Sequence, residues 1–292
     1  MWNRLPWLLR TLLAASAVTG ATTVVWGVLV QSNLRFYPRL PWAAVVMIVF
    51  LFFYWKYLQG WGWPQSTSAA RRAGLRAPPI SAPLWRWSLL AGGLALSASI
   101  LLFILSHRLI RLPQPPHSDL SHIPVITLLP SLIMSALVAG IGEEAGFRGY
   151  LQGSLERHHG PALGIAVTSV VFGLAHLTHG AFLPAILFDI AWGALYGLLT
   201  YRSGSIVPAI VLHSSADALE FIAAWKFPSS AQATLVWVSG PDTSLWFNSA
   251  LMVLLGGASI WAFRHLPRTR PNVLESLNEF PGRLPADNRS SR

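Results

Sequence analysis

The 292-residue sequence contains no cysteine, and it has few charged residues. The missing cysteine excludes disulfide bonds, thiolate nucleophiles and thiolate metal sites. Asp, Glu, Lys and Arg make up only 11% of the residues, whereas a soluble domain averages about 25%. Hydrophobic residues account for 53% of the chain, and its mean hydropathy is +0.49. A soluble enzyme, a disordered chain and a fibrous chain are therefore excluded, and a polytopic helical membrane protein remains.

Acidic residues are fewer than basic ones. The chain has 11 Asp and Glu against 21 Lys and Arg, which gives a formal net charge of +10. In a soluble protein this excess would suggest binding to nucleic acid. In a membrane protein it more often sets the orientation of the helices. We adopt the second interpretation and expect no nucleic-acid partner.

Eight apolar runs separated by polar clusters predict an all-α bundle of about eight transmembrane helices. They are residues 7–30, 41–57, 84–106, 123–141, 161–178, 181–201, 206–225 and 245–263. Most approach the length of about 20 residues that crosses a hydrocarbon core. If the N-terminus is inside, most of the 21 basic residues lie in inner segments, which predicts that both termini are cytoplasmic. The first run has some features of a signal peptide, but we interpret it as a span because it is long and lacks a clear cleavage site.

Ionisable residues within apolar runs are costly in a membrane and indicate function. Apart from Arg10, and from Lys56 and Arg86 at the ends of the second and third runs, they lie between positions 143 and 220. The C-terminal half is therefore where we expect chemistry, and the first three runs are expected to be scaffold. The group consists of Glu143, Glu144, Arg148, His176, Asp189, His213, Asp217 and Glu220.

The two adjacent glutamates are expected to differ in role. Neighbouring side chains on a helix point about 100° apart. Arg148 follows Glu144 by four residues, the spacing of a favourable ion pair, so Glu144 is expected to be structural. Glu143 is then free to act as a base. The alternative is a solvated helix end with ordinary charges.

His176 is expected to lie level with Glu143. A turn near residues 158–160 would place both about 24–26 Å from that turn in an antiparallel hairpin, so the two could share one water molecule. Taken alone, His176 could equally be a structural histidine, and Asp189 is interpreted as a structural acid that could partner a histidine.

His213 and Asp217 share one helix face because they are four residues apart. Such a pair could fix the imidazole tautomer, bind a metal or stabilise an oxyanion. The alternative is a hydrogen bond that joins two helices.

Three motifs together resemble the CPBP intramembrane proteases. EExxxR spans residues 143–148, FxxxH spans 172–176 and HxxxD spans 213–217, and the resemblance covers about residues 125–225. That family includes type II CAAX prenyl endopeptidases and Abi-like bacteriocin-processing or immunity proteins. Asp217 stands where many members have Asn.

The resemblance implies an eight-helix membrane protease with its site in the second half of the chain. It implies a CPBP-like core at residues 123–226, after N-terminal helices and loops at 1–122. A last membrane helix at 227–264 and a disordered cytoplasmic tail at 265–292 would follow. It also implies that Glu143 is the general base with His176, and that His213 and Asp217 stabilise the oxyanion. Glu144, Arg148 and Phe172 would support them.

We therefore expect an intramembrane endopeptidase that acts on membrane-associated proteins or peptides, in contact with lipid, in the inner (cell) membrane of a bacterium. The cofactor is none or Zn²⁺, and a metal would be bound by Glu143, His176 and His213. Two alternatives stay open. The first is a non-catalytic scaffold or bacteriocin-immunity protein of the same fold, and the second is a proton-coupled transporter that uses Glu143 and Asp189.

Overall fold

A computed structural model describes residues 4–111, 120, 122–179, 182–226 and 234–267. Within these residues all regular secondary structure is helical, which confirms the all-α prediction, and each of the eight predicted runs contains a helix. Those eight helices are α1 (Trp7–Phe36), α2 (Trp42–Leu58), α4 (Ala82–Leu109), α5 (Val125–Glu143), α7 (Pro161–Ala175), α8 (Leu183–Ser203), α9 (Val207–Lys226) and α11 (Thr243–His265). Three short helices join them: α3 (Ser68–Leu75), α6 (Gly153–His159) and α10 (Val236–Ser239).

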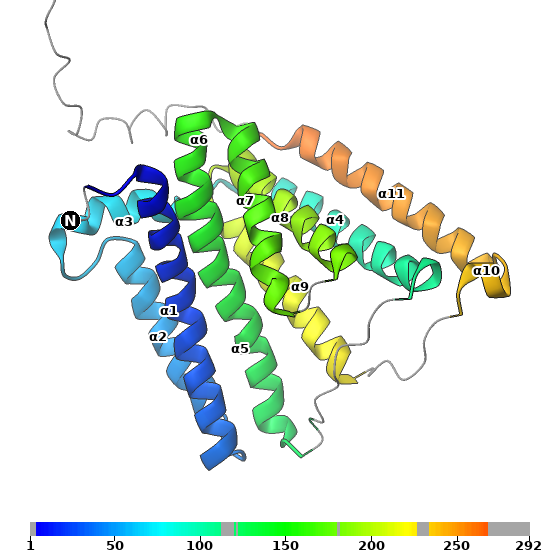
Figure 1. The fold of residues 1–292 in the computed structure, drawn as a ribbon, viewed down its shortest axis with the longest axis horizontal. Helices are drawn as coiled ribbons and strands as arrows, with labels where there is room; N and C mark the ends of the chain where they lie inside the picture. The colour runs from blue at the N-terminus through cyan, green and yellow to red at the C-terminus, as the bar shows by residue number, and fades with distance from the viewer. Residues whose placement is uncertain (1–3, 112–119, 121, 180–181, 227–233, 268–292) are drawn as a thin grey trace, which may run out of the picture.

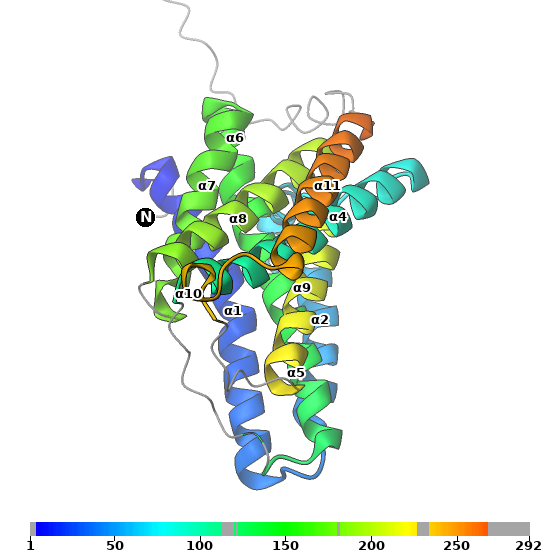
Figure 2. The ribbon, with the colours of Figure 1, turned by 90° about the vertical axis from the view of Figure 1, so that its right-hand side faces the viewer.

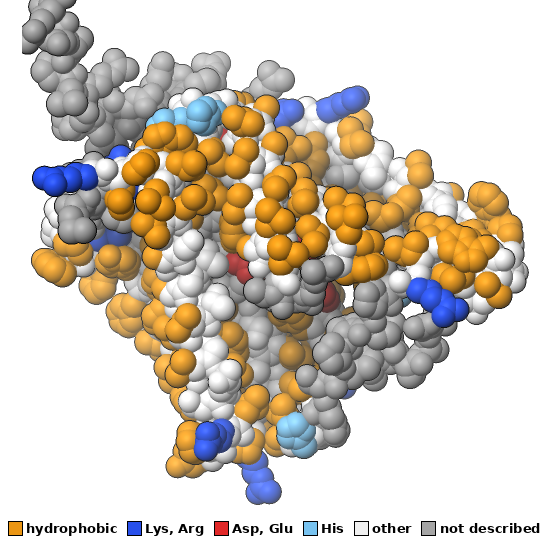
Figure 3. Space-filling view, in the orientation of Figure 1, with side chains coloured by type: hydrophobic (Ala, Val, Ile, Leu, Met, Phe, Trp, Pro, Cys, Tyr) orange, Lys and Arg blue, Asp and Glu red, His pale blue; other side chains and the backbone are white. Residues whose placement is uncertain are grey.

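The helices have the length and composition of membrane spans. In the described part of the chain, six helical stretches are long and apolar enough to cross a membrane, while α2 and α7 are apolar but shorter. Hydrophobic side chains cover most of the face in Figure 3, and Lys and Arg side chains lie toward its edges. The chain is therefore an integral membrane protein. The number of spans and the side of the termini stay predictions.

Helices α1, α2 and α5 form one bundle, whose lower ends extend beyond the other helices (Figures 1 and 2). Trp26, Met47 and Met134 are buried together at its centre. Trp26 Nε1 also donates to Ser135 Oγ at 2.9 Å. The turn between α1 and α2 is held by Asn33, whose amide nitrogen donates to two carbonyl oxygens and whose amide oxygen accepts from Ala43 N. This bundle is the scaffold against which α5 is positioned.

The helix that carries the two glutamates continues well beyond the predicted apolar run. After α5, residues Glu144–Gln152 form a π-helix, and α6 extends the stretch to His159. The chain turns at Gly160, whose φ of +82° suits a residue without a Cβ, and α7 starts at Pro161. The hairpin predicted at residues 158–160 is therefore confirmed.

The remaining long helices lie on the other side of α5. Helix α8 packs against α7, α9 packs against α5, and α4 and α11 form a pair that runs obliquely to α1 and α5 (Figure 1). Gly193 lets α8 approach α7 closely, since a Cβ there would lie 3.0 Å from Ser169 Cα. Ser259 Oγ donates to Ala91 O at 2.8 Å between α11 and α4.

Two predicted boundaries differ from the structure. The run at 161–178 was expected to be helical throughout, but α7 ends at Ala175, and His176–His179 form a single tight 3₁₀ turn. The stretch between the second and third predicted runs, for which no helix was predicted, contains α3. Residues 268–292, most of the predicted tail, lie outside the described residues, and the division into domains stays a prediction.

Candidate active site

The π-helix brings Glu144 and Arg148 together in the protein interior. Arg148 Nη1 donates to Glu144 Oε1 at 2.9 Å, and both side chains are fully buried. Arg148 Nη2 donates to Gly193 O on α8 at 3.2 Å, and its guanidinium lies over the Phe172 ring of α7, 4.2 Å from the centroid. The predicted ion pair is thus confirmed, and it ties the π-helix to both α7 and α8.

His213 of α9 is held by the same carboxylate. Its Nδ1 lies 2.9 Å from Glu144 Oε1. Because a carboxylate only accepts hydrogen bonds, Nδ1 carries the proton. The ring stacks on Tyr196, with centroids 4.8 Å apart and planes at 14°, while Phe172 packs against it edge-on. These contacts leave Nε2 facing Asp217 Oδ2 at 3.5 Å and Glu143 Oε2 at 3.9 Å.

His176 reaches Glu143 from the opposite side of the hairpin. Its Nδ1 lies 2.8 Å from Phe172 O, so this nitrogen donates to the carbonyl. Its Nε2 then points to Glu143 Oε2 at 3.9 Å. The prediction that Glu143 and His176 lie level is confirmed, although His176 begins the turn after α7 and does not lie inside that helix.

The cluster has a closed side and an open side. The side chains of Glu144 and Arg148 are 0% exposed and that of His213 is 6% exposed. Those of Glu143 and Asp217 are 19% and 20% exposed, and that of His176 is 19% exposed. Acidic side chains are visible at the middle of the face in Figure 3, away from the basic edges. A substrate would therefore meet Glu143, His176, Asp217 and the Nε2 edge of His213, with Glu144 and Arg148 behind them.

Residues 125–219 match the model of the type II CAAX prenyl endopeptidase Rce1-like family. This segment resembles an Rce1-like domain. The match confirms the family resemblance predicted from the three motifs, all of which it contains, and it supports a protease at the family level. Comparisons with curated proteins and with solved structures gave no match.

The predicted metal ligands in the Rce1-like segment do not form a metal site in the arrangement described. Among the described residues, no group of three or more His, Cys, Asp or Glu side chains is placed to hold a metal ion. Zinc binds nitrogen and oxygen ligands at about 2.0–2.2 Å. Glu143 Oε2 lies 3.9 Å from Nε2 of both His176 and His213. The mechanism proposed below uses no metal ion.

Two further acids from the sequence analysis lie on neighbouring helices. Asp189 lies in α8, and Glu220 lies in α9 beyond Asp217. Both interact with other groups in the structure. The contacts given above join the other six members of the predicted group.

Two residues that support the site were missed by the sequence analysis. Tyr196 stacks on His213, and Gln152 Nε2 donates to Gly197 O on α8 at 2.9 Å. The place of Gln152 beside the ion pair could have been predicted, because Glu144, Arg148 and Gln152 follow one another at intervals of four. For Tyr196 the sequence offered only its position beside Gly197, within the stretch that resembles the family.

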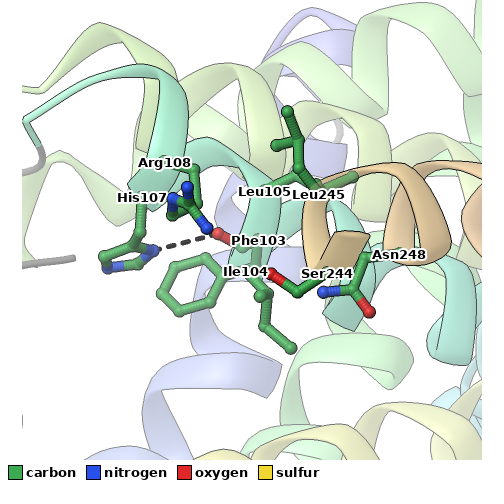
Figure 4. Close-up of a pocket in the computed structure, with 8 residues that line it drawn as sticks. All are labelled: Phe103, Ile104, Leu105, His107, Arg108, Ser244, Leu245 and Asn248. Atoms are coloured by element: carbon green, nitrogen blue, oxygen red, sulfur yellow. Dashed lines mark hydrogen bonds between the residues drawn. The ribbon is translucent and has the colours of Figure 1, made fainter. Parts of the chain in front are cut away.

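A separate cavity of about 250 Å³ lies between α4 and α11 (Figure 4). Its one arginine, Arg108, forms an ion pair of 3.0 Å with Asp242. No residue of the three motifs lines it. The lining residues are Phe103, Ile104, Leu105, His107, Arg108, Ser244, Leu245 and Asn248.

Proposed function

We propose that the protein is an intramembrane endopeptidase that hydrolyses peptide bonds of membrane-associated proteins or peptides. The observation that carries the proposal is the position of Glu143 Oε2. This atom is buried, has no hydrogen-bond partner among the described residues, and lies 3.9 Å from Nε2 of both His176 and His213. That separation is too long for a hydrogen bond, yet one water molecule can bridge it with bonds of about 2.7–3.0 Å.

Glu143 would activate this water. Both histidines carry a proton on Nδ1. Neutral His176 can therefore accept one hydrogen bond from the water at Nε2, and the other water proton is directed at Glu143. As the water oxygen bonds to the scissile carbonyl carbon, one water proton passes to the Glu143 carboxylate. Collapse of the tetrahedral intermediate breaks the C–N bond, and protonated Glu143 returns that proton to the leaving amine.

His213 would stabilise the negative charge on the carbonyl oxygen. In its protonated form it donates from Nε2 to the oxyanion, while Glu144 accepts from Nδ1 and stabilises the imidazolium. Asp217 faces the same Nε2 at 3.5 Å, and as a carboxylate it further stabilises the imidazolium. Arg148 keeps Glu144 oriented, so its effect on the reaction is indirect.

The Rce1-like match and the membrane setting support a substrate class. The site lies among helices long and apolar enough to cross a membrane, so a substrate anchored in lipid can reach it. The Rce1-like match supports a CAAX-type processing activity, and we propose a prenylated peptide as the first substrate to test. Location in a bacterial inner membrane is part of the same proposal.

The test uses the purified full chain in micelles with a fluorogenic CAAX peptide, with and without its prenyl group. Glu143→Gln is expected to lower kcat by about 10²–10⁴-fold, the usual worth of a general base. Asp242→Asn is the matched control, because it makes the same carboxyl-to-amide change in the ion pair with Arg108 beside α11. Full activity of Glu143→Gln would exclude Glu143 as the base.

Two further outcomes decide the remaining parts of the proposal. Loss of activity with EDTA and recovery with Zn²⁺ would overturn the metal-free mechanism and assign the metal to Glu143, His176 and His213. A wild-type protein inactive on both peptides would favour the scaffold or immunity alternative.

A further inference from the structure

A segment outside the Rce1-like match packs directly on the π-helix. The end of α3 lies so close to Gly149 that a Cβ there would be 2.6 Å from Gly74 O. Tyr150 Oη donates to Arg71 O at 3.4 Å at the same contact. The link between α2 and α4 thus packs against the helical stretch that carries Glu144 and Arg148, although it lies well outside residues 125–219.

Arg76, directly after α3, connects the elements that carry the site. Its carbonyl oxygen accepts from Ile206 N at 3.0 Å, at the start of the helix that bears His213. Its Nη1 donates to Arg148 O in the π-helix at 3.3 Å. Its Nη2 forms an ion pair of 2.8 Å with Glu156 of α6, and both side chains are about one tenth exposed. One residue thereby contacts the π-helix, α6 and the entry to α9.

The backbone of Arg76 has an unusual conformation. With φ at +53° and ψ at +46° it is left-handed, and among the described residues it is the one non-glycine residue with positive φ. This region is disfavoured for any residue with a Cβ. Such a conformation persists where the surroundings fix it, and it is then evidence for a role. A π-helix is also rare and is often found at functional sites, so contacts from outside that stabilise it are informative about function.

We propose that Arg76 is a positioning residue for the proposed hydrolysis. It holds the π-helix against the start of α9, and so keeps Glu144 at 2.9 Å from His213 Nδ1. The inference rests on the proposed function and adds a residue that none of the three motifs contains. Arg76 acts through Glu144 and His213 and does not touch substrate.

The test compares Arg76→Gly with Arg76→Lys and with Arg72→Ala. Glycine accepts the left-handed backbone and keeps the carbonyl that bonds Ile206 N, so this change removes the guanidinium without adding strain. Arg76→Gly is expected to lower kcat at least tenfold, to leave KM within twofold, and to move the pH profile of kcat. Arg76→Lys should recover part of kcat. Arg72, on the exposed side of α3 with a bond to Gln59 O, is the control and should behave as wild type.

Hydrogen exchange provides a readout that does not need activity. Amides of residues 144–152 should exchange at least tenfold faster in Arg76→Gly than in Arg72→Ala, at a temperature where both are folded. If Arg76→Gly only lowers thermal stability and keeps the wild-type kcat, pH profile and exchange rates, the inference is wrong. If the wild type has no peptidase activity, the proposed function fails, and the exchange rates alone decide whether Arg76 holds the π-helix.

Discussion

Replacing Arg148 with methionine would leave the buried Glu144 carboxylate without its guanidinium partner, and His213 Nδ1 would be the contact that remains. Breaking a buried ion pair by removing one partner costs about 3–5 kcal/mol, because the remaining charge is desolvated. The pair is 2.9 Å long and 0% exposed on both sides, so solvent cannot replace the lost guanidinium. The bond to Gly193 O and the contact with Phe172 are lost as well. We therefore expect the free energy of unfolding to fall by at least about 3 kcal/mol, a large part of a total of about 5–15 kcal/mol.

The assay is reversible unfolding of the full chain in mixed micelles with increasing SDS, followed by circular dichroism. Two controls separate charge from packing. The double variant with Glu144→Gln and Arg148→Met removes both charges while the side chains keep a similar volume. It should recover about half or more of the stability that Arg148→Met loses. Arg108→Met breaks a pair of similar length, 3.0 Å, whose acid is 50% exposed, and it should change stability far less.

The reasoning would be refuted by either of two results. One is an Arg148→Met protein that unfolds at the same SDS fraction as wild type. The other is a double variant that is less stable than Arg148→Met, since the penalty would then come from lost packing and not from an unpaired charge.

Three further predictions follow from single contacts. Asp217→Asn should keep kcat within about tenfold of wild type, because the amide still faces His213. Asp217→Leu should lower kcat by more than about 10²-fold, the expected effect of losing one oxyanion-site contact. Equal kcat values for the two variants would contradict this role of Asp217. Gly149→Ala should lower thermal stability, because the new Cβ would meet Gly74 O at 2.6 Å, and an unchanged melting temperature would show that α3 moves freely. Bonds from Ser244, Leu245 N and Arg108 lower the pKa of Asp242, so the contribution of this carboxylate is complete above the ordinary value of about 3.9 and is lost only as pH falls toward the lowered pKa. Protection of the Leu245 amide against exchange should therefore persist to about pH 4, and its loss between pH 6 and 5 would contradict the prediction.

Much of the fold could be predicted from the sequence, because it depends on residues that are close together in the chain. Apolar runs of the right length predicted the helices, since a chain in lipid must satisfy its backbone polar groups by hydrogen bonds within each helix. The spacing of four between Glu144 and Arg148, and between His213 and Asp217, predicted two close pairs, because side chains at that spacing share a helix face. Both pairs are present in the structure.

Other features of the site could not be predicted because they depend on contacts between distant segments. No local rule shows that Glu144 binds His213, 69 residues away. The same holds for Tyr196 stacking on that ring and for Arg76 bonding the π-helix, since each needs the relative placement of two helices. The π-helix itself was missed because its residues have an ordinary helical spacing and composition.

The sequence by itself determined that this is a helical membrane protein, and it placed the ionisable residues of its membrane-embedded part in one half of the chain. Composition and periodicity suffice for this, because charge is so costly in lipid that its position is informative. Only the tertiary structure decided that Glu143 Oε2 has no hydrogen-bond partner in the described residues while Glu144 is bound by Arg148 and His213. The spacing of four to Arg148 already indicated which of the two glutamates is structural. Only the packing of α8, α9 and the π-helix brings His213 to Glu144 and leaves Glu143 facing two histidines.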